Sequence, residues 1–236
     1  MRKKDIIINS NSDKLPISVT MFIPEVDIKG IVQISHGMAE HKERYFDFME
    51  YLANQGYVTI INDHRGHGKS IKEKEDLGFF YDNSSEYIVE DLHQITLYIK
   101  ELYPNKEMIL FGHSMGSMVV RKYIKKYDKD IDKLIVCGSQ SKNPFAGLAI
   151  FITKIMKIFK GDKYRSNFIQ NLAFGSYNKN IKNAKSKNSW ICSNNETVES
   201  YDNDELCGFI FTLNGFENLF RLMKEIYQKD GWRSEE

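Results

Sequence analysis

The sequence has few cysteines, no excess of charge of either sign and no long hydrophobic run. Its three cysteines, Cys137, Cys192 and Cys207, are scattered and odd in number, which argues against a disulfide framework and a cysteine-based zinc site. We expect them to be reduced, buried thiols. Lys and Arg number 33 and Asp and Glu 32, a formal charge of +1, so no global field attracts nucleic acid or an anionic membrane.

No apolar run approaches the roughly 20 residues that a membrane-spanning helix needs. The basic start of the chain is followed by only three consecutive isoleucines, too few for the apolar region of a signal peptide. We therefore expect a cytoplasmic protein that has no nucleic-acid partner.

The first 140 residues alternate between short apolar runs and helical patterns. The predicted strands cover residues 5–9, 17–23, 30–35, 57–62, 107–111 and 131–137, and the predicted helices cover 44–55, 84–103 and 115–127. The first two strands indicate an antiparallel hairpin. The later units predict an α/β fold with a mostly parallel sheet and helices on both faces. In such a sheet the chemistry gathers at the carboxyl ends of the strands.

The alternation ends near residue 142. Helical patterns at 145–160, 167–174 and 217–228 are joined by segments rich in Asn, Lys and Ser. We predict that residues 1–141 form the core and residues 142–236 an inserted helical cap. The first cap helix is strongly apolar and carries lysines late in its length. It either packs over the mouth of the site or acts as a lid that contacts membrane lipid and lines an acyl-chain pocket, which would make the protein peripheral at the membrane.

Three motifs stand at the carboxyl ends of predicted strands. Residues 36–41 read HGMAEH, residues 63–70 read DHRGHGKS and residues 112–116 read GHSMG. The last fits G-x-S-x-G, a sharp turn between strand and helix that exposes a serine hydroxyl, here that of Ser114. The glycines are needed because a Cβ on either side would collide across so tight a turn.

Together these motifs resemble the α/β-hydrolase superfamily, and more closely its monoacylglycerol lipase and lysophospholipase branch, which shares sequence with the serine aminopeptidase-type hydrolases. The resemblance covers residues 5–140 well. In the cap it is confined to residues 204–209, DELCGF, where the branch has proline in place of Glu205. It implies an α/β-hydrolase fold with an inserted cap, and hydrolysis of an acyl ester or lysolipid through an acyl-enzyme on Ser114. We expect no cofactor and no metal.

Ester hydrolysis needs a nucleophile, a base, an acid that orients the base, and donors for the developing oxyanion. Ser114 is the predicted nucleophile. The predicted donors are the backbone N–H groups of Met38, which follows the His36–Gly37 turn, and of Met115, which follows the nucleophile.

All six histidines precede Ser114, whereas the hydrolase order is Ser, acid, His. We interpret His36 and His64 as residues that brace their loops, His113 as packing beneath the turn, and His93 as a helical histidine with its own partners. His64 and His67 could also be imagined as metal ligands, but no carboxylate–histidine pattern of zinc hydrolases accompanies them.

No histidine follows Ser114, and no carboxylate follows the predicted strand at 131–137. Asp202 and Asp204 lie in the cap, away from the place expected for the acid. We therefore expect a chain that stops early and lacks the last strands, about 60 residues with the acid and the histidine. The strand at 131–137 would then be an open, apolar edge. The alternative is a non-catalytic α/β-hydrolase-like module that binds a lipid or small molecule.

Overall fold

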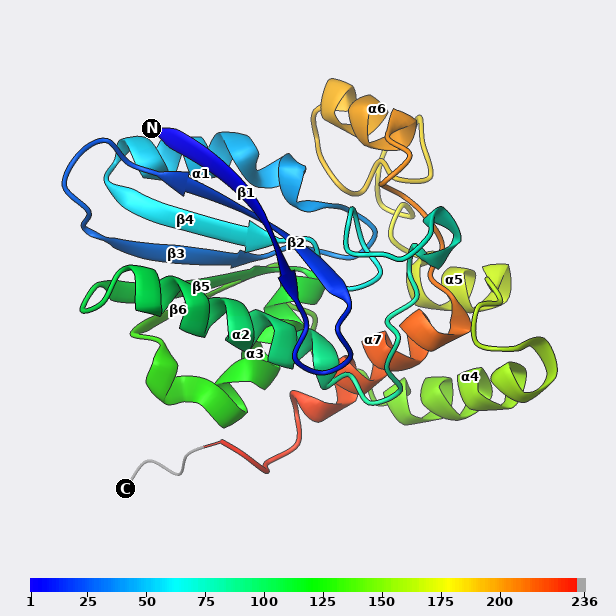
Figure 1. The fold of residues 1–236 in the computed structure, drawn as a ribbon. Helices are drawn as coiled ribbons and strands as arrows, with labels where there is room; N and C mark the ends of the chain where they lie inside the picture. The colour runs from blue at the N-terminus through cyan, green and yellow to red at the C-terminus, as the bar shows by residue number, and fades with distance from the viewer. Residues whose placement is uncertain (233–236) are drawn as a thin grey trace.

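The computed structural model describes residues 1–232 and has a six-stranded sheet with helices on both faces (Figure 1). The strands are β1 (Arg2–Asn9), β2 (Pro16–Ile23), β3 (Gly30–Ser35), β4 (Tyr57–Asn62), β5 (Glu107–His113) and β6 (Lys133–Cys137), in the order β1-β2-β4-β3-β5-β6. The first two form the predicted antiparallel hairpin, and β3 to β6 are parallel. The predicted mostly parallel α/β architecture is confirmed.

Three helices cover the sheet. The helix α1 (Phe46–Asn54) lies on one face, and α2 (Tyr87–Leu102) and α3 (Met115–Tyr127) lie on the other (Figure 1). Successive side chains of one strand point to opposite faces. Ile31 of β3 accordingly packs in the cluster of Ile95 from α2, whereas its neighbour Val32 packs in the cluster of Met49 from α1. Both faces of the central strands are buried, as their continuous apolar runs predicted.

Four helices follow β6. They are α4 (Ala146–Lys160), α5 (Asn167–Phe174), α6 (Asn195–Asn203) and α7 (Leu213–Glu225). The short polar helix α6 was missed by the hydrophobic pattern, although Asn194 signals its start by accepting hydrogen bonds from the N–H groups of Glu196 and Thr197. The predicted start of α7 at residue 217 was too late. The helix begins at Leu213, because the side chain of Thr212 caps it by accepting a hydrogen bond from the N–H of Gly215.

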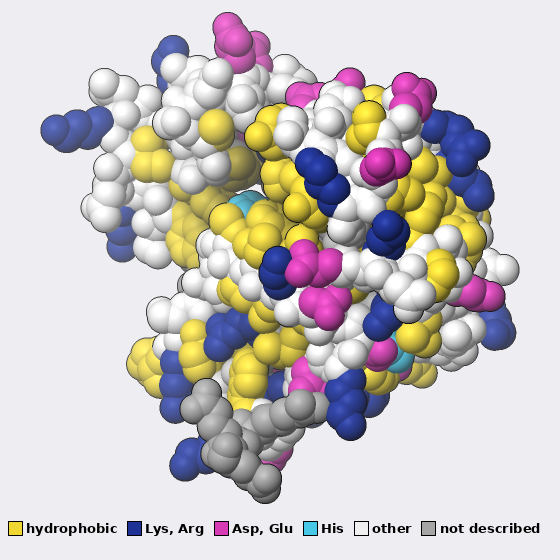
Figure 2. Space-filling view, turned by 90° about the vertical axis from the view of Figure 1, so that its left-hand side faces the viewer, with side chains coloured by type: hydrophobic (Ala, Val, Ile, Leu, Met, Phe, Trp, Pro, Cys, Tyr) yellow, Lys and Arg dark blue, Asp and Glu magenta, His cyan; other side chains and the backbone are white. Residues whose placement is uncertain are grey.

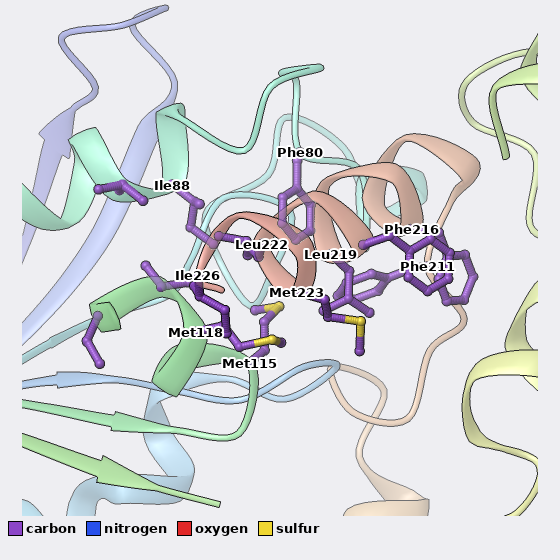
Figure 3. Packing of buried hydrophobic residues seen from close by; sticks show 14 of the residues in the cluster. Phe80, Ile88, Met115, Met118, Phe211, Phe216, Leu219, Leu222, Met223 and Ile226 are labelled. Carbon is purple, nitrogen blue, oxygen red and sulfur yellow. The ribbon is translucent and has the colours of Figure 1, made fainter. Parts of the chain in front are cut away.

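The helix α7 is buried along most of its length. Figure 3 shows Leu222 and Met223 of α7 packed beside Met115 and Met118 of α3. The helix α4 packs against another side of α7. There the buried carboxylate of Glu217 accepts a hydrogen bond from Lys157 of α4 at 2.9 Å. The division at residue 142 remains a prediction, but α7 shares its hydrophobic cluster with the core helix α3.

The strand β6 is an edge of the sheet, and within residues 1–232 no strand pairs with its outer side. Ile135 and Val136 are 47% and 41% exposed. The predicted open edge is therefore present. Of the three free thiols, Cys207 is buried as expected, whereas Cys137 is exposed on this edge. No helix in the described part of the chain has the length and apolarity to cross a bilayer.

Candidate active site

Ser114 sits between β5 and α3 with φ 52° and ψ −118°, a conformation that L-residues rarely adopt. Its backbone N–H donates to the carbonyl of Cys137 at the end of β6, at 2.9 Å. The strand β5 continues through His113, two residues beyond its predicted end, so that the serine follows directly on a hydrogen-bonded strand. This geometry is the turn that the sequence predicted.

Close backbone approach explains both glycines of the turn. A Cβ on Gly116 would lie 2.0 Å from the carbonyl oxygen of Ser35, and a Cβ on Gly112 would lie 2.6 Å from that of Gly116. Both distances are far below van der Waals contact. The turn can therefore pack against β3 and α3 only if both positions are glycine.

The loop after β3 lies directly against the serine. A Cβ built on Gly37 would be 3.3 Å from the Cβ of Ser114, and Met38 lines the same cavity as Ser114. Among the described residues, the N–H of Met38 donates to no protein acceptor. Met115 is the first residue of α3, where an N–H has no partner within the helix. Both N–H groups are thus available to an oxyanion, and that role remains a prediction.

The carboxylate of Glu40 holds this loop in shape. Its Oε1 accepts hydrogen bonds from the N–H of Gly37 at 2.5 Å and from the hydroxyl of Tyr45 at 2.8 Å, and its Oε2 accepts one from Nε of Arg44 at 3.0 Å. Burial alone would raise the pKa of Glu40, but His113, His36 and these hydrogen bonds outweigh it and lower the pKa to about 2. Glu40 is therefore a buried, charged acceptor.

Tyr45 joins the two loops of the site. Its hydroxyl donates to Glu40 and lies 3.0 Å from Nδ1 of His113, which therefore donates to it. A continuous chain of hydrogen bonds thus runs from the residue before the nucleophile to the backbone of Gly37. The interpretation of His113 as packing beneath the turn was wrong, because 43% of its side chain is exposed. Figure 2 shows hydrophobic side chains around a hollow on one face of the molecule.

His36 and His64 brace their loops, as the sequence indicated. Nδ1 of His36 donates to the carbonyl of Gly37 at 2.8 Å, while its Nε2 accepts from the N–H of His64 at 2.9 Å. The hydroxyl of Ser35 lies 2.9 Å from Nε2 of His64. Burial lowers the pKa of both imidazoles and lowers that of the adjacent His67 to about 3. All three rings are therefore neutral at pH 7.

Residues 201–208 support the outer side of the loop after β3. The carbonyl of Ala39 accepts hydrogen bonds from the hydroxyl of Tyr201 at 2.7 Å and from the N–H of Gly208 at 2.9 Å. His41 is 2.8 Å from Asp204. The stretch DELCGF, which carried the resemblance in the cap, thus supports the loop after β3 from outside.

One group of side chains has the composition of a metal site. His41, Asp204 and Cys207 bring one ligand atom each within 4.8 Å of one another. Burial, and next the charge of Asp204, raise the pKa of Cys207 to about 12, so the thiol is protonated rather than the thiolate that binds metal. Hydrogen bonding already accounts for His41 and Asp204, and we assign this group a structural role.

A cavity of about 380 Å³ opens beside Ser114. Its inner side is formed by Met38, Ala39 and Ser114. Its outer wall comes from α5 and the segment up to residue 190, which contribute Asn167, Gln170, Asn171, Phe174, Tyr177, Asn178, Asn188 and Trp190. No residue of α4 is among its lining residues. The expectation that the first cap helix lines a pocket was therefore wrong, and α5 takes that place.

Within residues 1–232 the structure brings no base or acid to the serine. Among the described residues, the Ser114 hydroxyl has no hydrogen-bond partner. The histidines are engaged elsewhere: His93, for example, is 2.9 Å from Asp130 and stacks on Tyr127. Asp204 faces His41, and Asp202 accepts a hydrogen bond from Asn188. Neither aspartate is placed as a triad acid.

Comparison with known proteins agrees with this arrangement. A model of the family described as serine aminopeptidase, S33, matches residues 26–231. The chain belongs to this family of α/β-hydrolases. In its fold it is similar to a thermostable carboxyl esterase from Bacillus coagulans, with a TM-score of 0.87 and 27% identity over 96% of this chain and 74% of the esterase.

Curated relatives carry the names of lipid ester hydrolases. The chain is 28% identical over 138 residues to a monoacylglycerol lipase of Mycolicibacterium smegmatis, covering 58% of this chain and 47% of the lipase. It is 26% identical over 152 residues to a probable lysophospholipase L2 of Haemophilus influenzae, covering 60% of this chain and 45% of that protein. The chain thus spans less than half the length of these relatives.

Sequence reasoning missed Glu40 and Tyr45. The signal for Glu40 was present, since an acidic residue stands inside the motif HGMAEH. Tyr45 carried no signal, because it is one of several apolar residues at helical spacing, and only the fold brings its hydroxyl between two loops that are 68 residues apart.

Proposed function

We propose that this chain is the nucleophile-bearing part of a serine hydrolase that acts on carboxylic esters, of the monoacylglycerol lipase or lysophospholipase type. The observation that carries the proposal is the strained turn of Ser114 at the cavity, with the Gly37–Met38 loop packed against it. This pairing of an exposed hydroxyl with free backbone donors suits acyl transfer.

In the proposed reaction the Oγ of Ser114 attacks the ester carbonyl and gives its proton to a base. The N–H groups of Met38 and Met115 donate to the oxyanion, and each is worth about 10²–10³ in turnover. Collapse of the intermediate expels the alcohol, which takes up the proton from the base. Water then gives a proton to the base and attacks the acyl carbonyl, the bond between this carbon and the Oγ of Ser114 breaks, and Oγ takes up the proton as the carboxylic acid is released.

We propose that the base and the acid come from polypeptide outside these 236 residues and dock beside the open edge of β6. The exposed side chains Ile135 and Val136 support this, because a further strand would cover them. On this proposal, residues 1–236 alone are marginally soluble and barely hydrolyse short acyl esters.

The cap also suggests contact with a lipid surface. Large apolar side chains are exposed on α4 and on the residue before it, each at least 40% accessible: Phe145, Leu148, Phe151, Ile155, Ile158 and Phe159. The helix has three lysines and no acidic residue. We propose that this face touches membrane lipid transiently, which would place a lipid ester near the site.

Hydrolysis of p-nitrophenyl butyrate tests the proposal. Residues 1–236 would be assayed alone and fused to the segment of the Bacillus coagulans esterase that lies beyond the region this chain covers. The fusion should hydrolyse the ester at least about 10³-fold faster than the chain alone, and Ser114→Ala should abolish the gain. A folded fusion that is no faster than its Ser114→Ala variant would contradict the proposal.

The alternative is a module of the same fold that binds a lipid or small molecule without catalysis. It is favoured by the absence of any base near Ser114 among residues 1–232. The downstream reading frame separates the two: a further strand, an acid loop and a histidine loop support the hydrolase, and a stop codon supports the binding module.

A further inference from the structure

The net charge of +1 conceals a strong separation of charge along the chain. Ten of the 33 basic residues but only one of the 32 acidic residues lie between residues 142 and 195. This segment therefore has a formal charge of +9, and the remaining 23 basic and 31 acidic residues give −8. The one acidic residue of the segment, Asp162, already lies 3.1 Å from Lys157. The positive charge of the segment thus has almost no compensation within the segment itself.

Four of these basic residues stand close together in the outer wall of the cavity. Residues 179–187, which we call the lysine loop, read KNIKNAKSK and include no acidic residue. The four lysines are all exposed, and within residues 1–232 none of their ammonium groups has a hydrogen-bond or ion-pair partner: Lys179, Lys182, Lys185 and Lys187. Their ammonium groups are therefore open to an external anion.

The fold fixes both ends of the lysine loop at the cavity. Asn178 before the loop and Asn188 after it both line the cavity, as does Lys187 at the end of the loop. Nδ2 of Asn178 donates to the carbonyl of Ser186 at 2.8 Å, and this hydrogen bond closes the base of the loop. The lysines between these two ends therefore lie on the surface beside the cavity that contains Ser114.

Large apolar side chains are exposed on the same wall. Phe168 and Leu172 of α5 are 61% and 59% exposed, and Trp190, which lines the cavity, is 38% exposed. Lysines next to exposed Phe, Leu and Trp are typical of a surface that lies in the interface of an anionic bilayer, where lysines meet lipid phosphates and apolar side chains enter the acyl boundary. Nucleic acid would use the lysines but would leave the apolar side chains in water.

We infer that the lysine loop and the exposed apolar side chains of α5 bind the surface of a bilayer that contains anionic phospholipid. The loop supplies the electrostatic attraction, with lipid phosphates as the counter-ions that this segment lacks. A bilayer held by the loop lies next to the cavity beside Ser114. This inference rests on the proposed function, because a bilayer is the source of a lipid ester, and it adds a dependence on lipid charge to the contact proposed for α4.

Binding to vesicles of two compositions tests the inference. Residues 1–236 would be sedimented with vesicles of phosphatidylcholine alone and with vesicles that also contain phosphatidylserine. We expect at least about 10²-fold tighter binding to the anionic vesicles, because each lysine of the loop adds to the attraction. This preference should disappear as the ionic strength is raised to about 1 M, where charges on an exposed surface are screened.

Three substitutions made together probe the loop: Lys179→Gln, Lys182→Gln and Lys185→Gln. Lys187 is kept because it lines the cavity. This variant should lose at least about tenfold of the preference for anionic vesicles and bind phosphatidylcholine as before. The matched control removes the same formal charge at three exposed lysines outside the predicted cap and should keep the preference: Lys4→Gln, Lys29→Gln and Lys129→Gln. Circular dichroism identifies a variant that fails to fold, and the three single substitutions in the loop then decide.

Equal losses in the two triple variants would overturn the inference, because net charge alone would then explain them, and so would a preference that the loop variant retains. Binding to duplex DNA as tight as that to the anionic vesicles would overturn the assignment to a bilayer. The outcome is separate from the proposed function. Labelling of Ser114 by a fluorophosphonate without any lipid preference refutes only the inference, and a preference that depends on the loop without such labelling refutes only the hydrolase.

Discussion

The Glu40 carboxylate, on one side of the cavity, accepts hydrogen bonds from Gly37, Arg44 and Tyr45, whereas the oxygens of Gln170 and Asn178 on the other side have no protein donor. The first side is the frame, residues 36–45 and 112–117, and the second is the outer wall, residues 167–190. The comparison indicates that the frame is fixed by its own contacts before any ligand arrives. The wall, by contrast, leaves two buried amide oxygens without a protein donor in the described part of the chain.

A side chain at Gly116, where the backbone of the frame packs most closely, should cause the largest loss of stability. Gly116→Ala would place a Cβ 2.0 Å from the Ser35 carbonyl, so we expect loss of more than about 5 kcal/mol in the free energy of unfolding, or no folding at all. The matched control is Gly147→Ala in α4, where no atom lies within 4 Å of the new Cβ. It should be neutral or stabilise by up to about 1 kcal/mol. Urea unfolding measures both, and equal effects would refute the contrast.

The three buried histidines beside the nucleophile turn predict that the stability of the protein depends on pH. Burial lowers the folded-state pKa of His36, His64 and His67, whereas in the unfolded chain they take up protons as the pH falls through about 6.5. The unfolded state therefore binds more protons than the folded state at low pH. The free energy of unfolding decreases as the pH is lowered. Between pH 7.5 and 5.5 an imidazole that stays neutral in the folded chain costs up to about 1.4 kcal/mol, so His64 and His67 together should cost about 3 kcal/mol in urea unfolding, and His36 adds to this loss as far as its own pKa is lowered.

A variant of one histidine checks this assignment. His67→Phe keeps an aromatic ring beside Phe80, Phe209 and Phe211 and removes one of the three titrating groups. The loss between the two pH values should shrink by about 1.4 kcal/mol. A loss that is the same in both proteins would show that His67 is not the neutral buried group described above.

A smaller effect is expected when the hydrogen bonds that join the two loops of the frame are removed. Tyr45→Phe removes the hydroxyl between Glu40 and His113, which should cost about 1–2 kcal/mol of stability and slow the labelling of Ser114 by a fluorophosphonate about tenfold. The control is Tyr51→Phe on α1, whose ring is 62% exposed and which should change neither quantity. A Tyr45→Phe chain that is labelled at the normal rate would show that the loop does not depend on this hydroxyl.

The smallest effect on stability should come from the cap. Phe151 and Ile155 of α4 are 60% and 40% exposed, so changing both to Asp should alter the free energy of unfolding by less than about 0.5 kcal/mol. Binding to liposomes of phosphatidylcholine and phosphatidylserine should nevertheless fall at least about tenfold. The control is Ile7→Asp on β1, outside the predicted cap, which is equally exposed at 61%. Binding that the double change leaves intact would exclude this face.

The frame was largely predictable because its chemistry is local. Residues 112–116 needed glycines for a turn, and apolar strands of fixed period placed three motifs at one edge of the sheet. The cap was less predictable, because α6 is polar and α7 depends on Thr212, and neither signal is hydrophobic. The contact of Tyr45 with His113 could not be predicted, because it joins segments 68 residues apart that only the fold brings together.

The central claim is that Ser114 is a nucleophile in a preformed frame. It is tested most directly by incubating residues 1–236 with a fluorophosphonate and locating the adduct by peptide mass spectrometry. We predict slow labelling with the adduct on Ser114 and none in the Ser114→Ala variant, because the frame is present without a base. An adduct on another serine, with Ser114 unmodified, would contradict the account.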